Sequence, residues 1–237
     1  YNKVNRRIYR DFGEIENLQG IDSKIDRFFD KTYEFIEYNL RDYLNYCRPE
    51  WEFLDNKNST IKKDTYYWLL EPLSGKENFK RSIPIFSISI SVFLNDKVIA
   101  SSIYDPLRND FYFTEEGKGA FLNDHRIRVS NRKFLENSLI SLQLNNSNLE
   151  IDNLFSKYDL PLKNFRVFNS STVSLSWLCN GKLDCFIGIN MDQTFINSSK
   201  LFLRESGGFF LETNLNENNF FICANPTIHK KIIKILN

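Results

Sequence analysis

An acid, a glycine and a lysine stand close together in the segment Glu71-Pro-Leu-Ser-Gly-Lys76. A carboxylate is the hard oxygen ligand that Mg²⁺ prefers, so Glu71 could retain one weakly bound magnesium ion. Gly75 and Lys76 stand where a helix is expected to begin, and a lysine at a helix N-terminus could anchor a phosphate group. Each feature also has a structural interpretation, because an acid after a strand can cap a turn and a lysine can be solvated on the surface. The segment is therefore one candidate site for phosphate chemistry.

The other residue types that bind metals or act as nucleophiles are scattered. The cysteines form no CxxC pair and have no histidine at ligand spacing, which favours reduced thiols in a cytosolic protein over a zinc site or a disulfide framework. His125 falls in a predicted hairpin turn and His229 in the last predicted helix, so neither is assigned a role as general base. The four cysteines are Cys47, Cys179, Cys185 and Cys223.

Charge and hydropathy exclude several classes of partner. The 31 Lys and Arg residues balance 30 Asp and Glu residues, so the net charge of +1 gives no general attraction to nucleic acid. The basic clusters of residues 3–10 and 230–234 are interpreted as solvated helix faces. The longest apolar stretch, residues 83–94, is interrupted by serines and is too short to span a membrane. The opening Tyr-Asn-Lys lacks an apolar signal segment, and we expect a cytoplasmic protein without a membrane partner.

The first part of the chain predicts a helix followed by an antiparallel sheet. Apolar residues three or four apart indicate an amphipathic helix from Ser23 to near Pro49, and residues 65–70 indicate a strand that ends in a turn at Pro72 and Gly75. Strand-like runs separated by Asn-Asp or Gly turns then indicate a meander, which the helix can cover on one face. The predicted meander strands are 85–94, 97–104, 111–114, 120–122 and 127–129.

Helices and strands alternate in the second part, which indicates an α/β layer. The chain is expected to form one compact unit of two segments, 1–146 and 147–237, with the boundary in the polar stretch 145–147. Predicted helices are 149–158, 171–180, 197–205 and one from Pro226. Predicted strands are 139–144, 164–168, 183–187, 209–212 and 220–223.

Four separated stretches carry a family pattern. Residues 68–79 read Trp-Leu-Leu-Glu-Pro-Leu-Ser-Gly-Lys-Glu-Asn-Phe, and residues 104–130 contain Tyr-Asp-Pro, Gly-Lys-Gly-Ala-Phe and Val-Ser. Residues 166–184 begin with Arg, contain Asn-Ser and Gly, and end with Asp, and Glu-Ser-Gly-Gly follows at 205–208. In this order the stretches resemble the inositol monophosphatase family, which includes the bacterial suppressor protein SuhB.

The resemblance implies an α/β fold, a layered αβαβα sandwich, that hydrolyses small phosphate monoesters with Mg²⁺. Such a site pairs metal ions that activate water and neutralise the phosphoryl oxygens. The family holds its metals with a Glu from a Glu-Glu loop, both acids of Asp-Pro-Leu-Asp and a later Asp. Its Gly-Thr at a helix start offers N–H groups to the phosphate, a role that falls here to Gly75 and Lys76. The resemblance also suggests a homodimer.

The residues at the catalytic and metal positions depart from this pattern. The first Asp is Glu71, one methylene longer, and the second is Ser74, whose neutral hydroxyl cannot replace a carboxylate. The Thr is Lys76, whose charge repels a metal ion, and Asp55 is one shorter acid near the position of the Glu-Glu pair.

Two more positions differ. The late Asp, counted back from residues 205–208, falls at Ile196, and Asp192 could replace it if the loop is remodelled. The Asp that partners the family's Thr falls at Thr32. Each carboxylate lost at ~4 Å from an ion removes about 4 kcal/mol of attraction at an effective dielectric constant near 20. These replacements predict that magnesium-dependent activity is absent or severely reduced.

Two functions remain open from the sequence. The first is a catalytically impaired or inactive family member that binds a protein partner or a phosphorylated ligand through the former active-site cleft, since SuhB works with the transcription machinery. The second is an active Mg²⁺-dependent phosphomonoesterase, acting on inositol phosphate or a related ester, with a metal set drawn from Glu71, Asp55 and Asp192.

Overall fold

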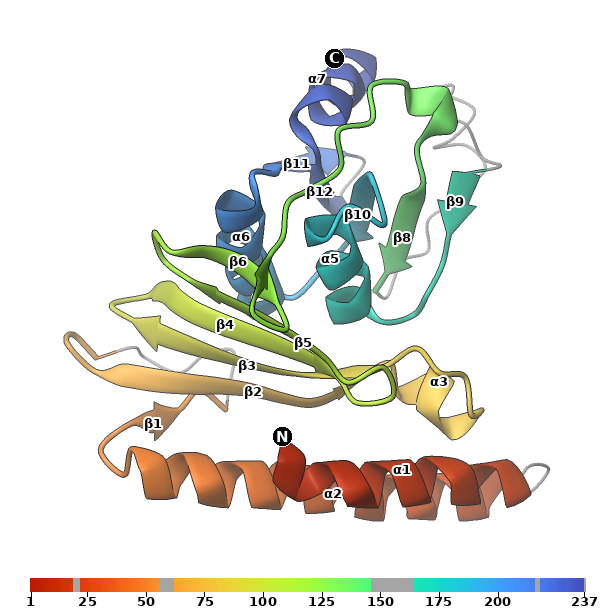
Figure 1. The fold of residues 1–237 in the computed structure, drawn as a ribbon, viewed down its shortest axis with the longest axis vertical. Helices are drawn as coiled ribbons and strands as arrows, with labels where there is room; N and C mark the ends of the chain where they lie inside the picture. Colours follow the sequence, from red (N-terminus) through yellow and green to blue (C-terminus); the bar gives the residue numbers. More distant parts are fainter. Residues whose placement is uncertain (19–21, 56–61, 146–163, 216–217, 237) are drawn as a thin grey trace.

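The computed structural model describes residues 1–18, 22–55, 62–145, 164–215 and 218–236. These residues form five layers, helix, sheet, helix, sheet and helix, as Figure 1 shows. Helices α1 (Asn2–Asn17) and α2 (Asp22–Cys47) cover the outer face of the first sheet, and α7 (Pro226–Leu236) covers the second. Helices α5 (Ser171–Cys179) and α6 (Gln193–Ser206) lie between the two sheets. The predicted αβαβα sandwich is confirmed.

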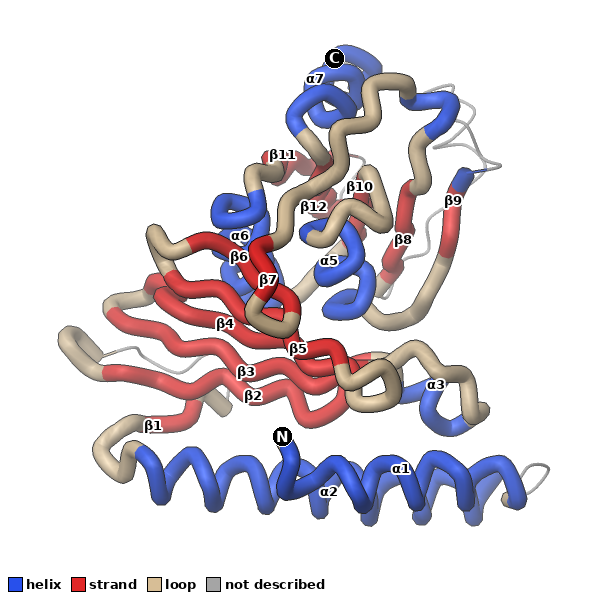
Figure 2. The backbone as a smooth tube through the Cα atoms, in the orientation of Figure 1, coloured by secondary structure: helices blue, strands red, loops and turns tan. Residues whose placement is uncertain are grey.

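The first sheet has the simple order β1 to β7 in the described residues. Its neighbours are antiparallel except β1 and β2, which are parallel. Figure 2 shows these strands as one twisted layer beneath α5 and α6. The strands are β1 (Glu52–Phe53), β2 (Tyr66–Ser74), β3 (Ser87–Leu94), β4 (Lys97–Asp105), β5 (Asp110–Glu115), β6 (Gly119–Leu122) and β7 (His125–Arg126).

The second sheet has the order β11-β12-β10-β8-β9 in the described residues. Strand β10 is parallel to β8 and antiparallel to β12, so the sheet is mixed. The predicted helix 149–158 lies outside the described residues. A short 3-10 helix, η1 (Leu135–Asn137), precedes this sheet. The strands are β8 (Ile140–Leu144), β9 (Phe165–Arg166), β10 (Cys185–Ile189), β11 (Phe209–Leu215) and β12 (Asn218–Ala224).

The long helix α2 follows its hydrophobic period. Ile25, Phe29, Ile36 and Leu40 are buried at spacings that place them on one face, toward the first sheet. The predicted helix from Ser23 is confirmed, with its end at Cys47 shortly before the proline.

One predicted strand end and one predicted strand in the first sheet are wrong. Strand β2 continues past Pro72 to Ser74, because the register shifts between Glu71 and Ser74 and a bulge tolerates a residue without an N–H donor. The predicted strand 127–129 is irregular, although Ile127 and Val129 are buried. The Val129 N–H donates to the carbonyl of Ser206 at the end of α6 rather than to a sheet neighbour.

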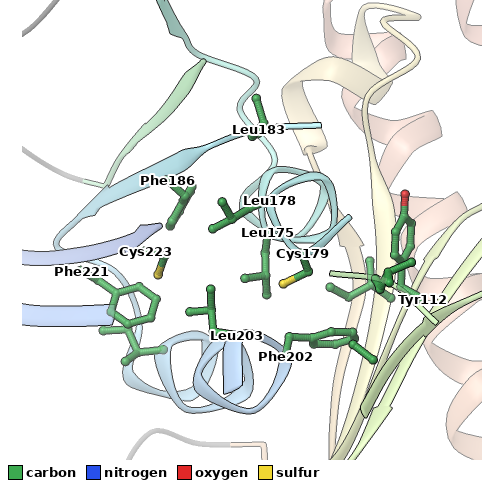
Figure 3. Close-up of a cluster of buried hydrophobic side chains, with 14 residues drawn as sticks. Tyr112, Leu175, Leu178, Cys179, Leu183, Phe186, Phe202, Leu203, Phe221 and Cys223 are labelled. Atoms are coloured by element: carbon green, nitrogen blue, oxygen red, sulfur yellow. The ribbon is translucent and has the colours of Figure 1, made fainter. Parts of the chain in front are cut away.

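A hydrophobic cluster joins the two sheets through α5 and α6. Figure 3 shows Leu178 of α5 and Leu203 of α6 among Phe186 and Phe221 of the second sheet, with Tyr112 of the first sheet at the other end. The cluster therefore contains residues of both predicted segments, and its packing fixes the ends of α5 and α6 relative to the first sheet.

Candidate functional site

A cavity of about 480 Å³ opens where the first sheet meets the N-terminal ends of α5 and α6. The sheet contributes residues of β2, β3 and β4, and the helices contribute residues of the N-terminal part of α5 and of α6 as far as Phe202. Its polar lining includes two carboxyl groups and several hydroxyl groups, and the rest is largely apolar. The polar residues are Glu71, Ser89, Ser101, Asn145, Ser171, Thr172, Asp192, Thr194 and Ser198, together with the phenol of Tyr33.

Glu71 projects from β2 into this cavity. The Ser89 hydroxyl on the neighbouring strand β3 donates to Glu71 Oε2 at 3.3 Å. Burial raises the pKa of the Glu71 carboxyl, hydrogen bonds from Ser74 and Ser89 oppose that rise, and the charge of Asp192 adds to it. Glu71 is thus a carboxyl group whose neutral form is favoured by its surroundings.

Asp192 reaches the same cavity from the other wall. It is the N-cap of α6, and its Oδ1 accepts the Thr194 backbone N–H at 2.9 Å and the Thr194 hydroxyl at 2.5 Å. Because of this cap, α6 begins at Gln193, four residues before the predicted start at Asn197. Glu71 and Asp192, the two predicted metal ligands, are brought together in one cavity.

Ser74 ends β2, Gly75 and Lys76 follow it, and none of the three is among the described residues that line the cavity. Ser74 is buried, with the Ser170 hydroxyl 3.3 Å from its own. Gly75 has a φ of +97°, and a Cβ there would lie 2.7 Å from the carbonyl of Ile85, so the turn requires glycine. Lys76 begins the predicted short helix α3 (Lys76–Lys80), and its exposed ammonium lies 5.1 Å from the ring centroid of Phe29.

The three remaining positions are not among the described residues that line the cavity. Asp55 is exposed and forms an ion pair with Arg41 of α2. Ile196 is buried in the cluster between the sheets. Thr32 is buried, and its hydroxyl donates to the buried carboxylate of Asp11 at 2.7 Å.

Two acids of the family pattern, Glu205 and Asp184, accept hydrogen bonds from backbone N–H groups. The Glu205 carboxylate accepts the backbone N–H groups of Gly117 at 2.9 Å and Gly119 at 2.8 Å, which ties α6 to the turn between β5 and β6. The Asp184 carboxylate accepts the N–H of Leu139 at 2.9 Å and pairs with Arg132 at 3.2 Å. Through these contacts Glu205 and Asp184 have structural roles.

Sequence reasoning missed the hydroxyl groups of the cavity. The alternating serines of β3 were interpreted as interruptions of an apolar stretch, yet Ser89 faces the cavity. Ser198 lies one helical turn after Thr194 on α6, and its buried Oγ has no hydrogen-bond partner among the described residues. The alternation of serine in a strand and the Thr194–Ser198 spacing were the available signals.

The chain has a layered phosphatase fold, in which one acid of a sheet and one acid at a helix N-terminus face the same cavity. The chain belongs to the inositol monophosphatase family, whose model matches residues 29–237. It is 27% identical to an inositol-1-monophosphatase of Mesorhizobium japonicum, over 98% of this chain and 91% of the relative. It is 33% identical to the Nus factor SuhB of Buchnera aphidicola from Acyrthosiphon pisum, over 77% of this chain and 71% of the relative.

The solved structures agree with this assignment. The extragenic suppressor protein suhB of Bartonella henselae superposes with a TM-score of 0.80 at 27% identity, covering 99% of this chain and 94% of that protein. Within the described residues, no helix is long and apolar enough to cross a bilayer.

The side chains of the described residues do not fit a centre of paired magnesium ions. Two carboxyl groups, Glu71 and Asp192, line the cavity, and Asp192 already caps a helix. Among the described residues, no group of three or more His, Cys, Asp or Glu side chains is placed to hold a metal ion. The sequence of residues 56–61, Asn-Lys-Asn-Ser-Thr-Ile, contains no acid. Magnesium takes several hard oxygen ligands in strict octahedral geometry, and the neighbouring hydroxyls carry no compensating charge.

Proposed function

We propose that this chain is a member of the inositol monophosphatase family that binds a protein partner or a phosphorylated ligand. It hydrolyses phosphate esters with magnesium poorly or not at all. The observation that carries the proposal is the lining of the cavity, where Glu71 and Asp192 are the carboxyl groups contributed by the described residues. The raised pKa of Glu71 further reduces the negative charge available to a cation.

A protein partner is part of this proposal, because relatives of this chain are named Nus factors. The roles of Gly75 and Lys76 in phosphate binding, a homodimer and a cytoplasmic location remain predictions. The placement of the Lys76 ammonium over Phe29 favours a surface role for this lysine over a role inside the cavity.

One observation favours the alternative, an active phosphomonoesterase with a rearranged metal set. Glu71 and Asp192 do share a cavity, and together they could bind a single magnesium ion. Asp55 does not support this alternative, since its carboxylate is paired with Arg41.

A magnesium titration by calorimetry, paired with phosphate release from inositol 1-phosphate and from a sugar phosphate, tests the proposal. We expect no saturable heat at millimolar Mg²⁺ and no turnover above the buffer blank. The inositol-1-monophosphatase of Mesorhizobium japonicum is the positive control for both substrates. Saturable binding together with turnover that Glu71→Gln abolishes would establish the alternative.

A further inference from the structure

A second cavity, of about 490 Å³, opens between helices α1 and α2 and one end of the first sheet. Its lining comes from the first residues of α1, the second half of α2, strands β4 and β5, and the turns at Asn109 and Asn123. It shares no described lining residue with the cavity that holds Glu71 and Asp192. Its volume lies within the roughly 300–1,000 Å³ common for small-molecule sites.

Aromatic rings from three elements and the start of the chain line the second cavity. Tyr1 stacks on Tyr104 of β4, with ring centroids 4.9 Å apart, and its centroid lies 5.8 Å from that of Phe111. Phe111 of β5 and Tyr43 of α2 are 37% and 55% exposed, so a substantial part of each ring is accessible. A flat aromatic ligand is stabilised by stacking on such rings.

Side-chain amides in the same lining have hydrogen-bonding groups that the protein does not use. The Tyr104 hydroxyl donates to Asn109 Oδ1 at 2.8 Å, and the Phe111 N–H donates to Asn123 Oδ1 at 2.9 Å. Neither Nδ2 group has a partner among the described residues. Asn39 is the reverse case, because its Nδ2 donates to a backbone carbonyl of α2 at 2.8 Å and its Oδ1 has no described partner. The lining therefore offers two donors and one acceptor on amides that are already held in place.

The charge of the lining favours a neutral ligand. Lys3 is the charged side chain among the described lining residues, and its ammonium pairs with Asp42 of α2 at 3.3 Å. Both side chains are more than half exposed, so the pair is solvated and adds little attraction for an anion. Aromatic rings beside amides that donate and accept match a nucleobase, which has flat faces and an edge with both kinds of group.

We propose that the second cavity binds a neutral nucleoside. The base stacks on the accessible rings of Tyr43 and Phe111, and its edge hydrogen-bonds to the asparagine amides. The lining has one lysine for the several phosphates of a polynucleotide backbone, which favours a free nucleoside over a nucleic-acid strand. The inference does not depend on the proposed function, because it uses no residue of the first cavity.

Calorimetric titrations of the full chain with adenosine, inosine, cytidine, uridine and D-ribose test the inference. We expect the best-bound nucleoside to have a Kd below about 1 mM, and D-ribose, which has no aromatic ring, to bind at least about tenfold more weakly. The inference is overturned if no nucleoside reaches that affinity or if D-ribose binds within that factor. Binding of the hexaribonucleotide of the same base more than about tenfold more tightly than the nucleoside would overturn the assignment to a free nucleoside.

Variants of the exposed rings locate the binding. Tyr43→Ala removes a ring from the lining, and we expect nucleoside affinity to fall at least about fivefold, the lower end of the effect of removing one stacked ring. Tyr43→Phe keeps the ring and should bind within about twofold of the unmodified chain. Phe111→Leu keeps apolar bulk without an aromatic ring, and it should also lose at least about fivefold.

Tyr46→Ala is the matched control, because Tyr46 is 83% exposed on the same helix and is not among the described lining residues. Its nucleoside affinity should stay within about twofold of the unmodified chain. Unchanged affinity in both Tyr43→Ala and Phe111→Leu would overturn this site, and so would equal losses in Tyr43→Ala and Tyr46→Ala. The proposed function fails by a different result, magnesium-dependent release of phosphate, so the two failures are distinguishable.

Discussion

Glu71 of β2 and Asp192 at the start of α6 face one cavity, where burial raises the pKa of the Glu71 carboxyl and the charge of Asp192 adds to that rise. In the folded chain Glu71 therefore keeps its proton to a higher pH than in the unfolded chain. Below the ordinary Glu range both states are protonated. As pH rises toward the raised pKa, the unfolded state releases its proton first and folding stability falls.

We expect Glu71→Gln to stabilise the protein at pH 8 by about 1 kcal/mol, the scale of one favourable substitution, and to have little effect near pH 4. Urea unfolding of both chains at the two pH values measures the difference. Glu77→Gln on the exposed side of α3 is the control and should change little at either pH. An equal effect of Glu71→Gln at both pH values would contradict this account of Glu71.

Restoring the family residues in the segment 71–76 should not restore hydrolysis. The triple variant Glu71→Asp, Ser74→Asp, Lys76→Thr still has Ile196 in the core at the late acid position. Without the full metal set, we expect release of phosphate from inositol 1-phosphate to stay at least about 100-fold below that of the Mesorhizobium japonicum relative. Circular dichroism of the variant confirms that it is folded. Strong recovery of activity would show that the missing ligands have been assigned to the wrong positions.

Glu205 should contribute to stability rather than to ligand binding. Glu205→Ala removes the acceptor of the Gly117 and Gly119 N–H groups, and we expect a loss of about 2–3 kcal/mol, since hydrogen bonds to charged groups are worth about 1.5–3 kcal/mol. Glu205→Gln retains one acceptor oxygen and should lose less. Urea unfolding measures both changes. An unchanged midpoint in Glu205→Ala would rule out this contact as a significant contribution to stability.

Thr32 should stabilise the folded protein through its hydrogen bond to the buried carboxylate of Asp11. Asp11 is fully buried between Arg7, Arg10 and the Thr32 hydroxyl. Thr32→Val removes one donor to this charge and should destabilise the protein by about 1.5–3 kcal/mol in urea unfolding. Thr32→Ser keeps the hydroxyl and should lose at most half as much. If both variants were equally destabilised, methyl packing and not the hydrogen bond would explain the role of Thr32.

The buried thiols should be unreactive in the folded protein. Burial raises the pKa of Cys179 to about 12 and raises the pKa values of Cys185 and Cys223 as well, so their reactive thiolates are scarce at pH 8. Cys47, half-buried at the end of α2, is the accessible thiol. Iodoacetamide followed by mass spectrometry should label Cys47 in the native protein and all four cysteines in guanidinium chloride. Rapid native labelling of Cys185 would contradict the packing of β10.

Local chemistry explains why much of the fold could be predicted from the sequence. The turns at Asn95, Asn109 and Asn123 all have positive φ, the conformation that Asn tolerates best among residues with a side chain. The end of β2 could not be predicted in this way. Its continuation past Pro72 depends on a bulge against β3, which involves residues distant in sequence.

The candidate site was predicted less completely than the fold. The family pattern placed the late acid at Ile196 and offered Asp192 as a replacement in a remodelled loop, and the structure places Asp192 in one cavity with Glu71. The hydroxyl lining was missed because Ser89, Thr172 and Ser198 belong to three elements that meet through long-range packing. The position of Lys76 at a helix start left a phosphate anchor and a surface lysine both open, and the contact of its ammonium with the Phe29 ring could not be predicted from that position.

The cavity between the first sheet and α5 and α6 exists when both predicted segments are folded together. A molecule that occupies it would therefore lower the free energy of the whole chain and not of one segment, by an amount that grows with the logarithm of its concentration. Protease resistance and cellular half-life would then rise with the supply of that molecule. The abundance of the protein would follow the concentration of the molecule.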